Sequence, residues 1–337
     1  MKILYDPEPR QTDEIFSTDD LARFRSDYGV VSYEGGDRDA FYNEHLPGAE
    51  VLIGQQPMDR ARLDLAPDLK AIFNVETNFL PNIDYAACFQ RSIHVLAPSS
   101  VFAVPVAEIG LGMALSLARG IHSAHSDFVA GKEMYGLEGN ADAELLTGSD
   151  IGFVGFGDLG RALFPLLAGF RATIRVHDPW LPDGALARTG VIPASLEDVL
   201  SQSRLVFVVA AITTENAHLL DRTALQLMQP GAMLVLLSRA AIADFDALRE
   251  LAGKGRIRVA TDVFPVEPVT SDDPIRSNPG ILLSAHRAGA LVQALHQIGA
   301  LVLEDLGQIS RGLPPIACKR AEPETVFRFR SKPIEKS

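Results

Sequence analysis

Three glycines between residues 155 and 160 have the spacing of a phosphate-binding turn. The segment Gly155-Phe156-Gly157-Asp158-Leu159-Gly160 follows the apolar run Ile151–Val154 and precedes a helical pattern over Arg161–Leu167. In such a strand–turn–helix unit the glycines allow a tight turn, close approach of a pyrophosphate to the backbone, and close packing of helix on strand. The free N–H groups and the dipole at the helix start attract the anion. The segment therefore predicts a dinucleotide site formed by Gly155, Gly157, Asp158, Leu159 and Gly160.

An acidic residue, Asp178, ends the next β-rich run, 18 residues beyond Gly160. A carboxylate at this position can accept hydrogen bonds from both hydroxyls of the adenosine ribose and would repel a 2′-phosphate. The sequence therefore favours NAD over NADP as the cofactor.

Three further side chains that can do chemistry each come shortly after a predicted strand. They are Arg239, Glu267 and His286. In an open α/β sheet, ligands bind at the carboxyl ends of the strands. Taken singly, each residue has an ordinary structural explanation: a surface ion pair, a loop residue and a packed side chain. Their joint position downstream of the glycine turn indicates a site.

The elements that must position these residues are short β-rich runs separated by amphipathic stretches. In the first hundred residues we predict strands at Lys2–Tyr5, Val51–Ile53, Lys70–Val75 and Ser92–Leu96. A second series has predicted strands at Ile151–Gly155, Thr173–His177, Leu205–Val209, Ala232–Leu237, Arg258–Asp262 and Ile281–Ser284. Strands that alternate with helices predict parallel sheets. The chain is thus expected to be an α/β protein.

Two long apolar stretches are predicted to be helical. Val104–Ile121 is apolar on nearly all sides, which predicts a helix buried between domains or subunits. Ala288–Arg311 is also apolar and could return the chain to the first domain. We therefore predict a discontinuous substrate domain, residues 1–102 plus 288–337, and a dinucleotide-binding domain, residues 103–287.

In order and spacing, the segments around Arg239, Glu267 and His286 resemble those of the D-isomer-specific 2-hydroxyacid dehydrogenases, a family with D-lactate, glycerate, phosphoglycerate and hydroxypyruvate/glyoxylate enzymes. The resemblance covers nearly the whole chain. It also includes Leu69–Ile72, Asn82–Asp84, Val104–Glu108 and Thr213–Glu215. It implies two doubly wound parallel-sheet domains, a flavodoxin-like substrate domain and a Rossmann NAD-binding domain, with a cleft between them.

The resemblance also implies roles for individual residues. Arg239 would hold the carboxylate and keto oxygen of a 2-keto acid, because a guanidinium offers a fixed fork of donors. His286 would exchange a proton with that oxygen while hydride moves to or from C2. Glu267 would bond the other imidazole nitrogen and fix the tautomer. The remaining cofactor contacts would come from Ala211, Thr213, Leu237, Ser238 and Asp262, of which Asp262 would face the nicotinamide carboxamide. No metal is needed, because the hydride chemistry belongs to the cofactor.

The sequence departs from the family pattern mainly in the first domain. There, a glycine-rich loop that binds carboxylate is replaced by Asn74–Pro81, with a glutamate in its centre. Our hypothesis is that Glu76, Thr77 and Asn78 bind a polar or hydroxylated tail of the substrate, and that Arg287 serves a second anionic group. The alternative is that Glu76 and Arg287 are solvated, or paired with each other or elsewhere.

The overall composition limits the partners. A net charge of −12 disfavours nucleic acid and anionic membranes as partners. Two cysteines without a CxxC pair fit a reducing compartment. The first residues have the pattern of a strand rather than of a signal peptide, so we expect a cytoplasmic protein.

Other functions on this fold stay open at this point. Formate dehydrogenases should carry glutamine in place of Glu267, which argues against that activity. Phosphite dehydrogenases and NAD-sensing regulators of the corepressor type share the Arg–Glu–His set. The family is usually dimeric, so a homodimer is expected by resemblance.

Overall fold

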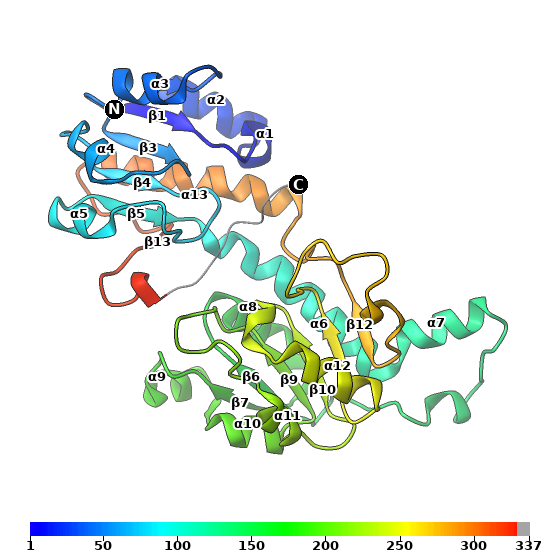
Figure 1. Cartoon of the computed structure of the whole chain (residues 1–337). Helices are drawn as coiled ribbons and strands as arrows, with labels where there is room; N and C mark the ends of the chain where they lie inside the picture. The colour runs from blue at the N-terminus through cyan, green and yellow to red at the C-terminus, as the bar shows by residue number, and fades with distance from the viewer. Residues whose placement is uncertain (329–337) are drawn as a thin grey trace. The chain divides into compact units, whose positions relative to one another are not determined.

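The computed structural model describes residues 1–328, which form two compact units (Figure 1). Unit 1 contains Met1–Phe102 and the segment that begins at Ala290, and unit 2 contains Ala103–Gly289. The last residues of the predicted substrate domain, 329–337, lie outside the described part of the chain.

Unit 1 is built on a six-stranded sheet of order β13-β5-β4-β3-β1-β2. Its strands are β1 (Lys2–Asp6), β2 (Gly29–Ser32), β3 (Val51–Gly54), β4 (Ala71–Phe73), β5 (His94–Ala97) and β13 (Lys319–Arg320). All of them are parallel except β13, which is antiparallel to β5. Strands β3 and β4 are buried along their whole length, as expected for the centre of a parallel sheet.

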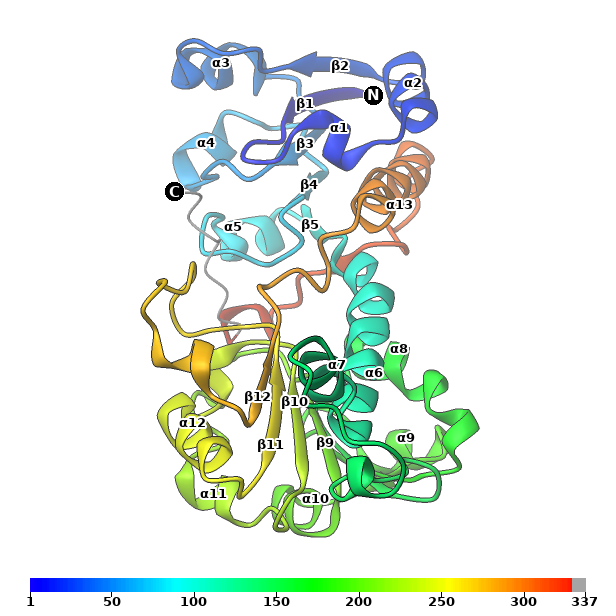
Figure 2. The ribbon, with the colours of Figure 1, turned by 90° about the vertical axis from the view of Figure 1, so that its right-hand side faces the viewer.

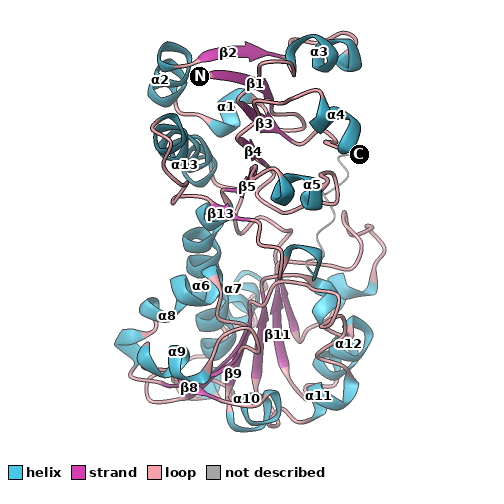
Figure 3. Ribbon diagram, turned by 90° about the vertical axis from the view of Figure 1, so that its left-hand side faces the viewer, coloured by secondary structure: helices cyan, strands magenta, loops and turns pink. Residues whose placement is uncertain are grey.

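Helices cover both faces of this sheet, because successive strand residues point to opposite sides. Ile3 and Tyr5 belong to a core with α1 (Thr12–Ile15), α2 (Thr18–Asp27) and α13 (Val292–Ser310). Leu4 belongs to the opposite core, with α3 (Arg38–His45), α4 (Arg60–Asp64) and α5 (Tyr85–Gln90) (Figure 3). Two short 3-10 helices complete the unit, η1 (Ser99–Phe102) and η6 (Val326–Arg328). Four of the helices begin where a polar side chain caps a free backbone N–H, at Ser17, Asp37, Asp59 and Asp84.

Unit 2 is built on a seven-stranded parallel sheet of order β12-β11-β10-β9-β6-β7-β8. Its strands are β6 (Asp150–Val154), β7 (Thr173–His177), β8 (Ile192–Pro193), β9 (Leu205–Val208), β10 (Met233–Leu236), β11 (Arg258–Thr261) and β12 (Ile281–Leu283). The strand order reverses between β6 and β9. Ligands bind beside such a switch point, at the carboxyl edge of the sheet.

One face of the unit 2 sheet carries α10 (Leu196–Gln202), α11 (Arg222–Gln226) and α12 (Phe245–Gly253) (Figure 2). The other face carries α6 (Ala103–Arg119) and α8 (Asp158–Leu166). The remaining elements are short: α7 (Ile121–Val129), α9 (Asp183–Arg188), η2 (Glu138–Asn140), η3 (Ala168–Phe170), η4 (Ala240–Ile242) and η5 (Pro274–Ser277).

The apolar helix predicted near residue 104 is a core helix of unit 2. Within the described residues, Ser99–Arg119 is long and apolar enough to cross a membrane; an 18-residue window of it has a mean hydropathy of 1.9, and 56% of that window is buried. A Cβ added at Gly110 would lie 2.6 Å from the Cδ1 of Leu237, which shows how closely α6 approaches the end of β10. The helix ends at Gly120, whose φ of +59° is left-handed.

All ten predicted strands are present, with ends displaced by at most two residues, so these predictions are confirmed. Three strands at sheet edges were not predicted: β2, β8 and β13. Strands β8 and β13 contain only two residues each, and β8 includes a proline, which sheets tolerate at their edges. Such strands lack the apolar run on which the prediction depends.

Candidate active site

The glycine turn connects β6 to α8, and its three glycines meet different constraints. Gly155 has a φ of +91°, and a Cβ there would lie 2.4 Å from the Cα of Ala210. A Cβ at Gly160 would lie 3.1 Å from the carbonyl oxygen of Gly155. By contrast, no protein atom lies within 4 Å of a Cβ built on Gly157. The fold thus requires glycine at Gly155 and packs tightly at Gly160, whereas the space over Gly157 is open.

Asp178 follows β7 and braces the same turn. Its Oδ2 accepts a hydrogen bond from the backbone N–H of Phe156 at 2.7 Å, and its Oδ1 accepts one from that of Trp180 at 2.9 Å. Each carboxylate oxygen retains a lone pair for a further donor. Asp178, the residue predicted to bind the ribose, therefore lies beside the glycine turn.

The loop after β9 is held by a residue that the sequence did not single out. The side chain of Asn216 accepts from the N–H of Thr213 at 2.7 Å and donates to the carbonyl of Ala211 at 2.8 Å. At the end of β10, Leu237 and Ser238 are both buried. The hydroxyl of Ser238 makes no hydrogen bond within the described residues.

The side chains of His286 and Glu267, which the sequence predicts as an acid/base pair, are in contact. The Nδ1 of His286 lies 2.6 Å from the Oε2 of Glu267, and the Oε1 of Glu267 accepts from the N–H of Phe264 at 2.8 Å. Both side chains are partly buried, with 31% and 21% of their surface exposed. The other imidazole nitrogen, Nε2, has no hydrogen bond within residues 1–328. The ring is therefore oriented through Nδ1 and leaves Nε2 for a ligand.

Arg239 follows β10, next but one in the sheet to β12, which precedes His286. Its Nη1 donates to the carbonyl of Ser238 at 2.7 Å, and it forms no ion pair within the part of the chain that the structure describes. Burial lowers the pKa of Arg239, and the negative charge of Glu267 acts in the opposite direction. The guanidinium remains charged at neutral pH and is available to an anion.

Asp262 holds the loop in which His286 lies. The residue is 1% exposed. Its Oδ1 accepts from the hydroxyl of Ser284 at 2.5 Å and from the N–H of Arg287 at 3.1 Å, and its Oδ2 accepts from the N–H of Ala288 at 2.9 Å. Its carbonyl also accepts from the N–H of His286 at 2.8 Å. The sequence predicted a nicotinamide contact for Asp262, and the structure adds this loop-closing role.

The three residues predicted to bind substrate in unit 1 follow β4. Glu76 is paired with Arg10, with 3.3 Å between Oε1 and Nε. Thr77 is 3% exposed with a φ of +69°, and its hydroxyl donates to the carbonyl of Glu76 at 2.5 Å. The amide of Asn78 donates to the same carbonyl at 3.4 Å. Arg287, which belongs to unit 2, is exposed and has no ion pair in the described chain. The sequence did not single out Arg10, which lies 65 residues from the carbonyl it bonds.

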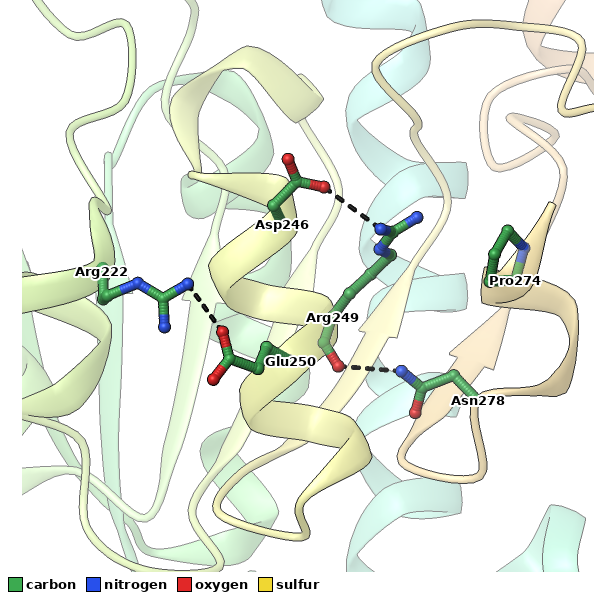
Figure 4. Close-up of a pocket in the computed structure, with 6 residues that line it drawn as sticks. All are labelled: Arg222, Asp246, Arg249, Glu250, Pro274 and Asn278. Carbon is green, nitrogen blue, oxygen red and sulfur yellow. Dashed lines mark hydrogen bonds and ion pairs between the residues drawn. The ribbon is translucent and has the colours of Figure 1, made fainter.

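A shallow depression on unit 2 contains none of the predicted site residues. It is lined by Arg222, Asp246, Arg249, Glu250, Pro274 and Asn278 (Figure 4). Ion pairs join Arg222 to Glu250 at 2.8 Å and Arg249 to Asp246 at 3.3 Å. Because its charged groups satisfy one another, we do not assign a ligand to it.

The sequence of unit 2 decides the family. Residues 111–288, more than half of the chain, match the model of the NAD binding domain of the D-isomer specific 2-hydroxyacid dehydrogenases. The chain belongs to this family. The family resemblance predicted from the sequence is thereby confirmed, as are the two-domain α/β fold and NAD as the cofactor.

Several members of the family are similar over most of this chain. The crystal structure of a phosphoglycerate oxidoreductase from Rhizobium etli is 50% identical, with a TM-score of 0.89, and the alignment covers 96% of this chain and 99% of that one. D-3-phosphoglycerate dehydrogenase of Methanocaldococcus jannaschii is 25% identical over 87% of this chain. (S)-sulfolactate dehydrogenase of Chromohalobacter salexigens is 29% identical over 77% of this chain and 83% of its own length. The chain spans about half of the curated phosphoglycerate dehydrogenases that it matches, 56% of the M. jannaschii protein.

The carboxyl edge of the unit 2 sheet fits NAD in three respects. The space over Gly157 is open to a pyrophosphate, α8 begins directly after this residue with free first N–H groups, and the buried hydroxyl of Ser238 has no hydrogen-bond partner within residues 1–328. No group of three histidine, cysteine or acidic side chains that could hold a metal ion occurs within residues 1–328.

Proposed function

We propose that the protein is an NAD-dependent oxidoreductase that moves a hydride between nicotinamide and C2 of a 2-keto acid or D-2-hydroxy acid. In this proposal, residues 103–287 form the NAD-binding domain, and residues 1–102 with the C-terminal segment form the substrate domain. The observation that carries the proposal is the His286–Glu267 pair, with Nε2 unoccupied, at the carboxyl edge of an NAD-binding unit.

In this proposal the cofactor binds at that edge. Asp178 would accept the hydroxyls of the adenosine ribose, and the Gly155–Gly160 turn with Asp158 and Leu159 would hold the pyrophosphate. Further cofactor contacts would come from Ala211, Thr213, Leu237, Ser238 and Asp262, of which Asp262 would face the nicotinamide carboxamide. Bound NADH supplies the hydride and bound NAD⁺ accepts it.

The chemistry of the protein itself is binding and proton transfer. Arg239 holds the substrate carboxylate and polarises the keto oxygen. The Nε2 of His286 gives a proton to that oxygen during reduction and takes it back during oxidation. Glu267 holds Nδ1 and stabilises the imidazolium form.

For the rest of the substrate we propose Glu76, Thr77 and Asn78 as the binding residues. Two relatives are named for phosphoglycerate and sulfolactate, which are 2-hydroxy acids with a further polar group. This supports a substrate with a polar third carbon. Exposed Arg287 is a candidate contact for an anionic substituent.

The test is NADH oxidation with a panel of 2-keto acids, followed by near-ultraviolet absorbance. We expect turnover, and we expect His286→Ala to lower kcat by about 100- to 10,000-fold, the usual contribution of a general acid. A histidine on α13 of unit 1 provides the control, as His296→Ala. Calorimetry should show that His286→Ala still binds NADH.

Two other outcomes would overturn the proposal. Tight NADH binding without turnover on any 2-keto acid would support an NAD-sensing regulator. Reduction of NAD⁺ by phosphite alone would support a phosphite dehydrogenase.

We also propose a homodimer formed through residues 121–145 of unit 2, which we call the arm. Helix α7 has no buried residue. Large apolar side chains of the arm are more than half exposed: Ile121, Phe128, Val129, Met134, Tyr135, Leu137 and Leu145. Exposed apolar patches of this kind mark protein interfaces. In light scattering, the double variant with Phe128→Glu and Leu137→Glu should be monomeric. Ile192→Glu, at the edge of the sheet, is the control and should remain dimeric. Dimers that persist in the double variant would contradict this interface.

A further inference from the structure

Unit 1 also has a carboxyl edge at which side chains converge. Strands β4, β3 and β1 are neighbours and parallel, so the segments that follow them emerge at the same edge of the sheet. These segments contain Asn74 and Glu76 after β4, Gln55 after β3, and Arg10 after β1. This is the edge at which parallel α/β sheets bind ligands.

The loop after β4 does not offer its backbone to a ligand. The neighbouring donors assign the Gln55 amide oxygen, rather than its nitrogen, to the position that faces the N–H groups of Val75, at 3.0 Å, and Glu76, at 2.5 Å. The N–H of Thr77 bonds the carbonyl of Asn74 at 2.9 Å. Three successive N–H groups are therefore already satisfied within unit 1. A ligand at this loop must be recognised by side chains.

Three side chains at this edge keep unused polar groups. Arg10 is only 17% exposed and uses its Nε for Glu76 and for the carbonyl of Val75 at 3.1 Å. Its two Nη groups make no hydrogen bond within the described residues. Asn74 is fully buried, yet its Nδ2 has no partner. Glu76 is 19% exposed, and its contact with Arg10 leaves lone pairs free.

We propose that Arg10, Asn74 and Glu76 form a subsite that recognises an uncharged hydroxyl on the substrate, beyond its reacting carbon. This inference rests on the function proposed above. The Arg10–Glu76 pair has no net charge, so a second anionic group would meet Glu76 and an amine would meet Arg10. A hydroxyl can accept from Arg10 or Asn74 and donate to Glu76, which satisfies both members of the pair.

Three substrates with the same carbon skeleton test the subsite: pyruvate, hydroxypyruvate and 3-phosphohydroxypyruvate, which carry hydrogen, hydroxyl and phosphate on C3. We expect kcat/KM to be about 10- to 100-fold higher for hydroxypyruvate than for pyruvate, the range for hydrogen bonds to charged groups. The phosphorylated acid should be no better than pyruvate. A second readout is calorimetric binding of D-glycerate and D-lactate to the NADH complex, in which no reaction can occur.

Two substitutions test whether the Arg10–Glu76 pair causes the preference for hydroxypyruvate. Arg10→Met should reduce the ratio of hydroxypyruvate to pyruvate to about 1, and Glu76→Gln should raise kcat/KM for the phosphorylated acid relative to hydroxypyruvate. The matched control is Arg60→Met, which breaks an exposed pair with Asp64 on α4 of the same unit and should leave all ratios unchanged. Thermal melting of each variant separates loss of binding from loss of folding.

The outcomes separate this inference from the proposed function. If no 2-keto acid of the wider panel oxidises NADH, the proposed function fails. If other 2-keto acids react but none of these three does, the enzyme stands and the subsite is wrong. If they react but 3-phosphohydroxypyruvate or pyruvate is preferred, the enzyme stands and the subsite is wrong. A hydroxypyruvate preference that survives Arg10→Met would also overturn the assignment.

Discussion

At the carboxyl edge of the unit 2 sheet, acidic side chains hold backbone. Asp178 bonds the N–H of the glycine turn, Asp262 bonds the loop of His286, and Glu267 bonds an N–H as well as the imidazole. At the corresponding edge of unit 1, acidic side chains meet arginines: Glu76 pairs with Arg10, and buried Asp6 lies 3.1 Å from Arg38.

This difference separates two kinds of ligand edge. In unit 2 the carboxylates bond backbone N–H groups of the loops. Arg239 therefore keeps its charge unpaired within the described residues and can attract an anion. In unit 1 the arginines are neutralised within the protein, so the edge suits polar but uncharged groups. The comparison predicts that unit 2 depends on backbone geometry and unit 1 on charge balance.

The largest expected effect tests the dependence of unit 2 on backbone geometry. Gly155→Ala puts a Cβ 2.4 Å from the backbone of Ala210 at a φ of +91°. We expect a loss of about 3 kcal/mol or more in the free energy of unfolding, measured in urea, because strain and overpacking add.

Gly157→Ala is the matched variant, since its Cβ meets no protein atom within 4 Å. It should change the free energy of unfolding by less than about 1 kcal/mol. Its affinity for NADH should nevertheless fall at least about 10-fold, because the methyl group occupies the approach of the pyrophosphate. If Gly155→Ala and Gly157→Ala had the same free energy of unfolding, the predicted dependence of unit 2 on backbone geometry would be wrong.

A second prediction compares one buried carboxylate from each unit. Asp305 on α13 is fully buried and accepts three backbone N–H groups, from Ile316, Ala317 and Cys318, at 2.6 to 2.8 Å. Asp262→Asn and Asp305→Asn should each cost about 2–3 kcal/mol of unfolding free energy, since an amide nitrogen then faces a donor.

Only Asp262→Asn should also lower kcat and change its dependence on pH, because Asp262 positions the loop of His286. Asp305→Asn should keep the parent pH profile at temperatures where it is folded. The same pH profile in both variants would show that Asp262 has no effect on His286.

The smallest effect concerns the opposite, amino edge of unit 2, where a carboxylate does meet cations. Glu144 bonds Arg204, which precedes β9, with 2.9 Å to its Nε, and also bonds Arg258 at the start of β11. Burial alone would raise the pKa of Glu144, but the hydrogen bonds and charges of the two arginines outweigh it and hold the pKa below its usual value.

A lowered pKa in the folded state stabilises the protein above the unfolded pKa, and this contribution is lost as the pH falls through the folded pKa. Glu144→Gln should therefore lower the free energy of unfolding by about 1 kcal/mol at pH 7. This loss should become smaller as the pH falls below about 4. Exposed Glu138→Gln is the control. A cost for Glu144→Gln that grows as the pH falls would contradict the assigned sign.

Local patterns were enough to predict all strands except β2, β8 and β13 at the sheet edges, and to single out the glycine turn and Asp178, because each of these depends on residues close together in the chain. The partners of site residues were harder to predict. Arg10 bonds a carbonyl 65 residues away, and Asp262 receives donors from 22 to 26 residues downstream. Such contacts depend on the order of the strands in the sheet, and the hydrophobic periodicity of the sequence does not give that order. The roles of the individual site residues remain predictions.

Trp180 is the single tryptophan of the chain, and its backbone N–H is bonded to Asp178 at the ribose end of the predicted cofactor site. The residue is 36% exposed. Because the chain has one tryptophan, all of its indole fluorescence comes from this position at the predicted cofactor site. NADH absorbs in the wavelength range in which tryptophan emits, so bound NADH should quench this fluorescence by energy transfer. The protein thus carries an intrinsic energy-transfer donor, with which cofactor occupancy can be followed without a label.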